Sequence, residues 1–327
     1  MRFGGWTVHV NQPVILRLIC FAIATVLLCW GGGIGFSTSA QTTNAGRADA
    51  LRNVFGTYDA EPRLPDGHVD VEKLVNELVT VRANTYNFLV WRAATDWEDL
   101  QRFLPRVRQH PIRIWVTLVP PSESPPHTRQ YSEPFRLDYV RWAVEIARLS
   151  LQETNLVAWS LDDFSYDGKT FTVEYTARMI GESRAINPRL AFVPCLYYGH
   201  ITPPLAEKYG PFVDGVLFPY RHEMGKRNLS DWDTLEREIA VVRERFQGKV
   251  PVFLDVYATK HSQLNDSSPE YVEQVMTLGR RFADGVLVYQ HQYEATSPAK
   301  YRVVKKLFER WAQEPTSRPQ TPGAPGR

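Results

Sequence analysis

The chain has 327 residues, enough for one large domain or two ordinary ones, and is 43% hydrophobic and 23% charged, as globular proteins are. It carries 38 Lys and Arg against 36 Asp and Glu, and two of the Arg lie in the first forty residues, so the remainder is formally neutral. This balance excludes the strongly basic surface that nucleic-acid binding requires, so we expect no nucleic-acid partner.

The first forty residues are similar to an export signal. A positive start is followed by an apolar run over residues 18–36 and by small residues at 38–40. The positive region is long for a cleaved signal, so an uncleaved membrane anchor is the alternative. In both cases we expect a secreted or periplasmic protein. The sequence leaves its oligomeric state open.

Strand and helix patterns alternate after a polar linker over residues 41–50. Strands are expected at 53–59, 85–91, 112–120, 156–161, 190–198, 214–220, 250–258 and 284–292. Helices are expected at 70–81, 97–109, 135–151, 172–186, 204–209, 231–246, 269–282 and 298–312, three of them with N-caps at Asp96, Ser230 and Ser268. Residues 313–327 are rich in Pro, Thr and Gly, and we expect a disordered tail there.

Eight strand-helix units over about 250 residues are the signature of a (β/α)₈ TIM barrel. We therefore predict an α/β protein with a single barrel domain at residues 51–312. An open doubly wound sheet is the competing fold. It usually has fewer strands and often carries a glycine-rich phosphate loop, and the sequence has no GxGxxG or GKS motif.

The fourth predicted strand ends in two adjacent acids, Asp162 and Asp163. Acids are depleted in strands because burying a charge is costly. Two carboxylates side by side cannot both ionise freely, so one pKa should be raised, which suits general acid and base catalysis. The structural alternative is a strand end followed by a helix N-cap, a position that Asp also favours.

Other strand ends carry acids, histidines and aromatic residues. In a TIM barrel the carboxyl ends of the strands form the functional face. Sugar rings offer flat C–H faces for aromatic stacking and hydroxyls for carboxylates and imidazoles. The residues that we expect to bind substrate are Tyr58, Asp59, Trp91, Tyr166, Tyr197, His200, Tyr220, His222, Glu223, Tyr257 and His291.

With its adjacent acids in WSLDDF (residues 159–164), and faintly through FGTYD (residues 55–59), the chain resembles barrel glycoside hydrolases of the family 84 β-N-acetylglucosaminidase type. The resemblance implies an exported enzyme that hydrolyses a polysaccharide or glycan. It also implies that Asp162 polarises the 2-acetamido group of the substrate and that Asp163 is the general acid and base. The chitinase pattern DxxDxDxE is absent, because no Glu follows at the expected place.

Three alternatives stay open. Asp255, at the end of the seventh strand, faces strand four across a barrel and fits the nucleophile of a retaining glycosidase that uses Asp163 as its acid and base. The barrel is otherwise a non-catalytic carbohydrate-binding protein whose acids only hydrogen-bond sugar. The third class is a metal-dependent hydrolase, but the histidines lack HxH or HExxH spacing, so we expect neither a metal nor a cofactor. Cys195, the one cysteine outside the first forty residues, is interpreted as a core residue.

Overall fold

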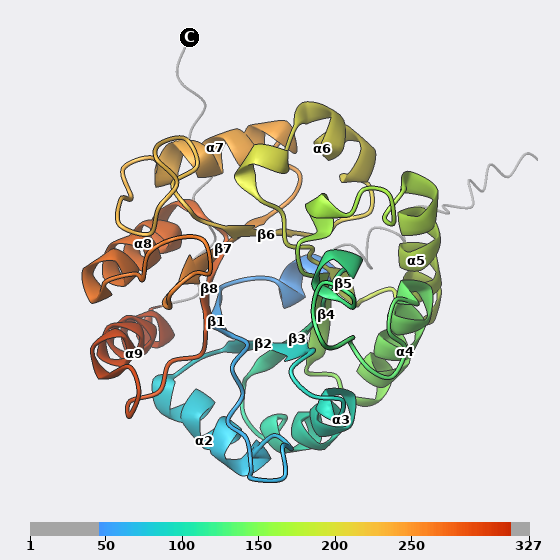
Figure 1. Cartoon of the computed structure of the whole chain (residues 1–327), viewed down its shortest axis with the longest axis horizontal. Coiled ribbons are helices and arrows are strands. Elements are labelled where there is room, and N and C mark those ends of the chain that lie inside the picture. The colour runs from blue at the N-terminus through green and yellow to red at the C-terminus, as the bar shows by residue number, and fades with distance from the viewer. Residues whose placement is uncertain (1–45, 315–327) are drawn as a thin grey trace, which may run out of the picture. The chain divides into compact units, whose positions relative to one another are not determined.

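The computed structural model describes residues 46–314 as eight parallel strands ringed by helices (Figure 1). This is the predicted TIM-type barrel. The strands are β1 (Val54–Tyr58), β2 (Thr85–Val90), β3 (Arg113–Leu118), β4 (Leu156–Leu161), β5 (Ala191–Phe192), β6 (Val216–Pro219), β7 (Val252–Tyr257) and β8 (Gly285–Tyr289).

The sheet order is β5-β4-β3-β2-β1-β8-β7-β6, and each pair of neighbouring strands in this order is parallel. This order leaves β5 and β6 at the two ends of the sheet. The chain just after β5 joins them, because Cys195 and Leu217 form a parallel bridge. The Leu196 amide donates to the Leu217 carbonyl at 2.9 Å, and the Leu217 amide donates to the Pro194 carbonyl at 3.0 Å. These bonds close the barrel.

Side chains alternate between two buried clusters along each strand, as the period of two requires. In β4, Ala158 belongs to a smaller cluster inside the barrel, while Trp159 belongs to the larger cluster between strands and helices. Close strand contact also fixes one residue: a side chain at Gly56 would come within 1.7 Å of the Thr85 carbonyl oxygen on β2. Only glycine lets β1 and β2 pair there.

The outer helices are α2 (Val71–Val81), α3 (Asp96–Val107), α4 (Tyr139–Gln152), α5 (Val173–Ile186), α6 (Pro203–Tyr209), α7 (Leu235–Arg245), α8 (Pro269–Phe282) and α9 (Pro298–Gln313). Short 3₁₀ turns are η1 (Pro121–Glu123), η2 (Phe164–Tyr166) and η3 (Tyr198–His200). The predicted cap at Ser268 is confirmed, since its side chain accepts the Tyr271 amide at 3.0 Å. The other two predicted caps are wrong: Asp96 is the first residue of α3, and α7 starts after Thr234, four residues beyond Ser230.

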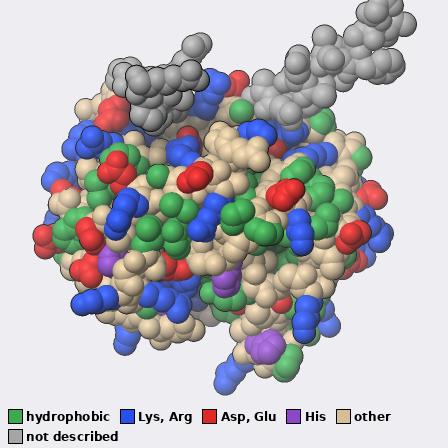
Figure 2. All heavy atoms as spheres, turned by 90° about the horizontal axis from the view of Figure 1, so that it is seen from above, with side chains coloured by type: hydrophobic (Ala, Val, Ile, Leu, Met, Phe, Trp, Pro, Cys, Tyr) green, Lys and Arg blue, Asp and Glu red, His purple; other side chains and the backbone are tan. Residues whose placement is uncertain are grey.

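The surface carries charges of both signs. Lys, Arg, Asp and Glu side chains are interspersed on the face of the molecule in Figure 2, in line with the neutral charge balance of the sequence. Among residues 46–314, no helix is both long and apolar enough to cross a membrane. The predicted signal or anchor, half of the linker (residues 41–45) and the predicted tail beyond Glu314 lie outside the described residues.

Candidate active site

A cavity of about 330 Å³ lies at the carboxyl ends of the barrel strands. It is lined by side chains that follow nearly every strand, including three carboxyl groups and several aromatic rings. Its lining is Tyr58, Leu89, Trp91, Arg92, Glu123, Asp162, Cys195, Tyr197, Pro219, Asp255, Tyr257, Thr259, Lys260, His261, Ser262, Tyr289 and Gln290.

Strand alternation explains much of this lining. In β7 the interior residue Phe253 is followed at steps of two by Asp255 and Tyr257, and both line the cavity. In β4 the interior residue Ala158 is followed at the same steps by Ser160 and Asp162, so Asp162 points into the barrel mouth. The predicted site residues that line the cavity are Tyr58, Trp91, Asp162, Tyr197, Asp255 and Tyr257.

Asp162 is held by two donors. The Tyr58 hydroxyl donates to its Oδ2 at 2.9 Å, and the Asp163 amide donates to its Oδ1 at 3.0 Å. Burial and then the neighbouring Asp163 carboxylate raise the pKa of Asp162 to about 7, against the lowering effect of these donors. Asp162 therefore changes protonation near neutral pH, as a catalytic carboxyl requires.

Asp163 adopts a left-handed backbone conformation with φ 44°, which Asp tolerates better than most residues. Its carboxyl is not part of the cavity lining, whereas the neighbouring Tyr197 does line the cavity. Burial raises the pKa of Asp163, while Tyr197 and the charge of Arg221 lower it. Asp163 thus reaches the cavity through Asp162 and Tyr197.

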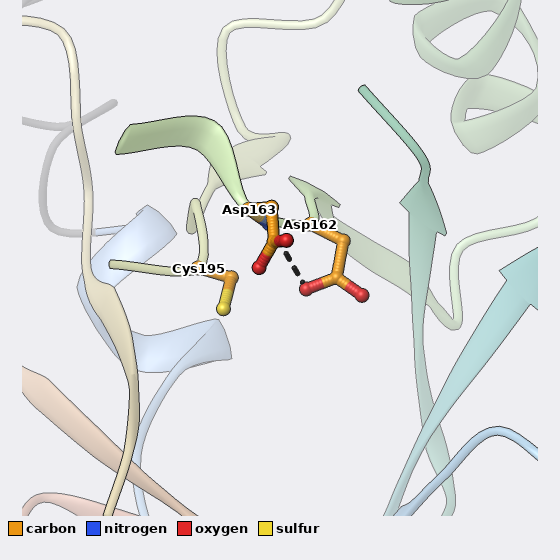
Figure 3. A group of neighbouring side chains, drawn as sticks. All are labelled: Asp162, Asp163 and Cys195. Atoms are coloured by element: carbon orange, nitrogen blue, oxygen red, sulfur yellow. Dashed lines mark hydrogen bonds between the residues drawn. The ribbon is translucent and has the colours of Figure 1, made fainter. Parts of the chain in front are cut away.

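Figure 3 shows the Cys195 thiol beside the two acids. One ligand atom from each of Asp162, Asp163 and Cys195 lies within 4.8 Å of the others, a spacing that a metal ion could bridge. Burial and the nearby acids raise the pKa of the thiol, however, and a thiol must ionise to bind metal. Tyr58 and the Asp163 amide already occupy both oxygens of Asp162. We therefore assign no metal to this group.

Two further carboxyl groups in the cavity have no partner. Within residues 46–314, neither Asp255 nor Glu123 has a hydrogen bond or ion pair to its carboxyl oxygens. Asp255 is 3% exposed, and burial followed by the charge of Asp162 raises its pKa well above the ordinary value. Burial followed by Asp162 and Asp163 raises the pKa of Glu123 to about 9. Both environments favour the protonated carboxyl, and Glu123 is mostly protonated at neutral pH.

The arginines of the site are already paired with acids. The fully buried Asp59 carboxylate accepts from Arg92, whose Nε lies 3.0 Å from Oδ1 and whose second nitrogen contacts Oδ2. Arg221 pairs with Glu223 at 2.8 Å and places its guanidinium 3.8 Å from the centre of the Tyr197 ring. Asp59 and Glu223 thus orient arginines and do not themselves line the cavity.

Five predicted site residues lie elsewhere. Tyr166 and His200 pack on each other with ring centres 4.2 Å apart, beside Tyr197 but outside the cavity lining. The remaining three are buried in other networks: Tyr220 bonds Thr234 at 3.1 Å, His222 bonds Asp233 at 2.8 Å and His291 bonds Thr57 at 2.9 Å. The structure does not bring Tyr220, His222 or His291 to the cavity.

The site also contains residues that the sequence analysis did not select. Glu123 comes from η1 after β3, and Lys260 and His261 come from the loop after β7. Cys195, interpreted as a core residue, is buried but also lines the cavity beside Asp162. Strand alternation could have found Cys195, because it follows the interior residues Ala191 and Val193 at steps of two.

Comparison with known proteins supports the fold alone. No family model and no curated protein sequence matches the chain. Among solved structures, a glucosidase from Croceicoccus marinus is similar over 80% of this chain and 68% of its own, with 11% identity and a TM-score of 0.56. A family 39 glycoside hydrolase from Bacteroides cellulosilyticus is similar over 81% and 65%, with 14% identity and a TM-score of 0.54.

A third similar structure is the PgaB (BpsB) glycoside hydrolase domain from Bordetella bronchiseptica. It has 11% identity and a TM-score of 0.52, and the match covers 79% of this chain and 98% of that domain. The chain spans only about half of another match, a β-D-glucuronidase of Dictyoglomus thermophilum, at 52% of its length. All of these structures are named as glycosidases or glycoside hydrolases. The specific likeness to family 84 does not appear among the similar structures described here.

Proposed function

We propose that the protein is a glycoside hydrolase whose catalytic carboxyl groups lie in the cavity at the carboxyl ends of the strands. One observation carries the proposal: three carboxyls and five aromatic rings line a single cavity on the functional face of a TIM barrel. Glycoside hydrolysis needs two carboxyl functions, or one carboxyl and help from the substrate. The glycosidase names of the similar structures point to the same reaction class.

Asp162 is the carboxyl that we place in contact with the scissile bond. It lines the cavity, and its pKa of about 7 lets it exist in either protonation state at neutral pH. Asp163 tunes Asp162 by its charge and its amide, and is linked to the cavity by Tyr197. The family 84 likeness implies another assignment, acetamido polarisation by Asp162 and acid-base catalysis by Asp163, and this is the finer alternative.

Aryl glycosides test the proposal directly. The full chain is incubated with a panel of aryl glycosides, wild type beside Asp162→Asn and Asp163→Asn, with circular dichroism as the control for folding. Activity on an N-acetylhexosaminide that falls in both variants supports the substrate-assisted route. Activity on another sugar alone supports glycoside hydrolysis but contradicts a preference for N-acetylhexosaminides. A wild type that binds oligosaccharide but cuts none is a carbohydrate-binding barrel instead.

The retaining mechanism with Asp163 and Asp255 is a second candidate. It is favoured by the position of Asp255, a buried and unpartnered carboxyl in the cavity. A nucleophile must be ionised, whereas burial and Asp162 favour the protonated form of Asp255. Asp255 therefore suits a proton donor better than a nucleophile. Trapping with a 2-fluoroglycoside, followed by mass spectrometry of the labelled peptide, would identify Asp255 if this mechanism operates.

Export remains part of the proposal. The apolar run over residues 18–36 supports it, because a signal or anchor has this pattern. Expression of the full chain in a bacterial host and N-terminal sequencing of the protein outside the cytoplasm tests the cleavage before Gln41. An intact N-terminus on protein in the membrane fraction would instead identify an anchor, and retention in the cytoplasm would remove the export proposal.

A further inference from the structure

A second cavity of about 340 Å³ adjoins the first. Arg92 and Gln290 belong to the linings of both cavities, so the two cavities share part of their walls. Both volumes are at the small end of the range for ligand pockets, which is room for a compact unit rather than for a long chain. The second cavity is lined by Ala60, Glu61, Arg63, Arg92, Gln290 and Tyr293.

The second cavity contains a buried carboxyl oxygen without a hydrogen-bond partner. Glu61 is 6% exposed, and its Oε1 accepts from the Tyr86 hydroxyl at 3.0 Å and from the Leu89 amide at 3.3 Å. Its Oε2 has no hydrogen-bond donor in the described part of the chain, and the nearest cation, Arg63, lies 3.6 Å away. A buried carboxyl oxygen without a donor is unfavourable, so a ligand hydroxyl at this point would be stabilising.

The charges of the second cavity indicate a neutral ligand. Arg63 pairs with the buried Asp96 at 2.9 Å, and Arg92 pairs with the buried Asp59. Each arginine is therefore already neutralised by a buried acid, so the cavity offers an anionic ligand no uncompensated positive charge. Burial followed by Asp59 raises the pKa of Glu61 to about 8, so this carboxyl is mostly protonated at neutral pH and does not attract a cation.

The remaining lining suits a sugar ring. Tyr293 offers an aromatic face, and its hydroxyl is already occupied because it donates to the Ala60 carbonyl. The Gln290 amide group offers both a donor and an acceptor in the wall that the two cavities share. Neutral charge, an unpartnered carboxyl oxygen and an aromatic face together match a hydroxyl-rich ring.

We propose that the second cavity is a sugar-binding subsite for the unit next to the one held in the first cavity. The substrate is therefore an uncharged oligosaccharide or polysaccharide with at least two units in contact with the protein, not a single glycoside. A hydroxyl of the second unit hydrogen-bonds Oε2 of Glu61, and its ring packs on Tyr293. This inference rests on the proposed function, because that proposal places a sugar in the first cavity.

Binding as a function of chain length tests the subsite without catalysis. Oligomers of one to four units, from an N-acetylglucosamine series and a glucose series, are titrated calorimetrically into the full chain carrying Asp162→Asn. We expect one series to gain about tenfold in affinity from one unit to two. The gain should disappear when Glu61→Met, which has no hydrogen-bonding group, or Tyr293→Ala is added, with one-unit binding unchanged. Glu72→Met, at an exposed glutamate of α2, is the matched control and should keep the gain.

Two results would overturn the subsite: affinities that do not depend on chain length in either series, or a gain that survives in both Glu61→Met and Tyr293→Ala. Two cavity variants are used because Glu61 also holds Tyr86 and Leu89, and a folding defect would appear in its circular dichroism. Failure of the proposed function gives a different result. If the wild type hydrolyses no glycoside but the affinity still rises with chain length and this rise is lost in the cavity variants, the subsite is supported and the catalytic proposal is wrong.

Discussion

The hydrogen bond from Tyr58 to Asp162 makes a quantitative prediction. The bond is 2.9 Å long and joins a 1% exposed phenol to a carboxyl whose pKa is about 7. A hydrogen bond to a charged group stabilises it by about 1.5–3 kcal/mol, and 1.36 kcal/mol corresponds to one pH unit. Tyr58→Phe should therefore raise the pKa of Asp162 from about 7 to about 8–9. In the reaction, the acidic limb of the kcat/KM profile should move to higher pH by the same amount, if Asp162 acts in its ionised form.

The assay is a titration of carboxyl carbons by NMR in the chain labelled at aspartate, with Asp162→Asn used to assign the resonance. Tyr289→Phe is the matched control, because the Tyr289 ring lies 5.1 Å from that of Tyr58 in the same cavity but does not hydrogen-bond Asp162. An Asp162 pKa that stays the same or falls in Tyr58→Phe would refute the reasoning. So would an equal rise in Tyr289→Phe, since burial alone would then explain it.

Three further predictions concern stability. Arg92→Met leaves the buried carboxylate of Asp59 without its cation and should cost about 3–5 kcal/mol in urea unfolding, most of it restored by adding Asp59→Asn; a loss below about 1 kcal/mol would contradict the pairing. The folded pKa values of Glu61 (about 8) and Asp162 (about 7) exceed those of the unfolded chain, so the folded state holds protons that the unfolded state has released. The Tm should therefore fall as pH rises from 5 to 9, and a rise in Tm would contradict this. Burial also raises the pKa of Asp255, so its ionisation at high pH favours the unfolded state. Asp255→Asn should therefore raise Tm at pH 8 and bring no gain at pH 4, and a lower Tm of the variant at pH 8 would contradict this.

The sequence predicts the barrel well because burial on both faces gives each parallel strand a distinct apolar run. The fifth strand shows the limit. It is predicted at 190–198, whereas β5 covers only Ala191–Phe192. Pro194 has no amide proton to donate, so the ladder is interrupted there. The chain still follows a strand path, since the Val193 and Cys195 amides donate to carbonyls of β4.

Helix starts are less predictable because one side chain can serve several purposes. The Asp96 carboxylate accepts the amides of Trp91 and Ala93 and pairs with Arg63, so it fixes the preceding loop rather than capping α3. The Ser230 amide donates to the Asn228 side chain in a turn that precedes α7. Both residue types favour caps and turns alike, and only tertiary contacts decide between them.

Part of the site follows from strand alternation and part does not. Counting in steps of two from interior residues places Asp162, Asp255 and Tyr257 in the cavity, and the same count selects Pro219 rather than Tyr220 on β6, where Leu217 is interior. Glu123 comes from a turn, where no periodicity applies. The sequence also gives no sign that Asp59 pairs with Arg92, which lies 33 residues further along the chain. This pairing occupies the Asp59 carboxylate, which was predicted to bind substrate.

The most direct test of the central claim is the initial rate of glycoside hydrolysis by the full chain, wild type beside Asp162→Asn, on the best substrate of the aryl glycoside panel. We predict turnover by the wild type and a fall of about 10²–10⁴ in kcat for Asp162→Asn, with folding intact, because a positioned carboxyl acid or base contributes about this much. Equal rates in the two proteins, or no turnover of any glycoside by a folded wild type, would contradict the account.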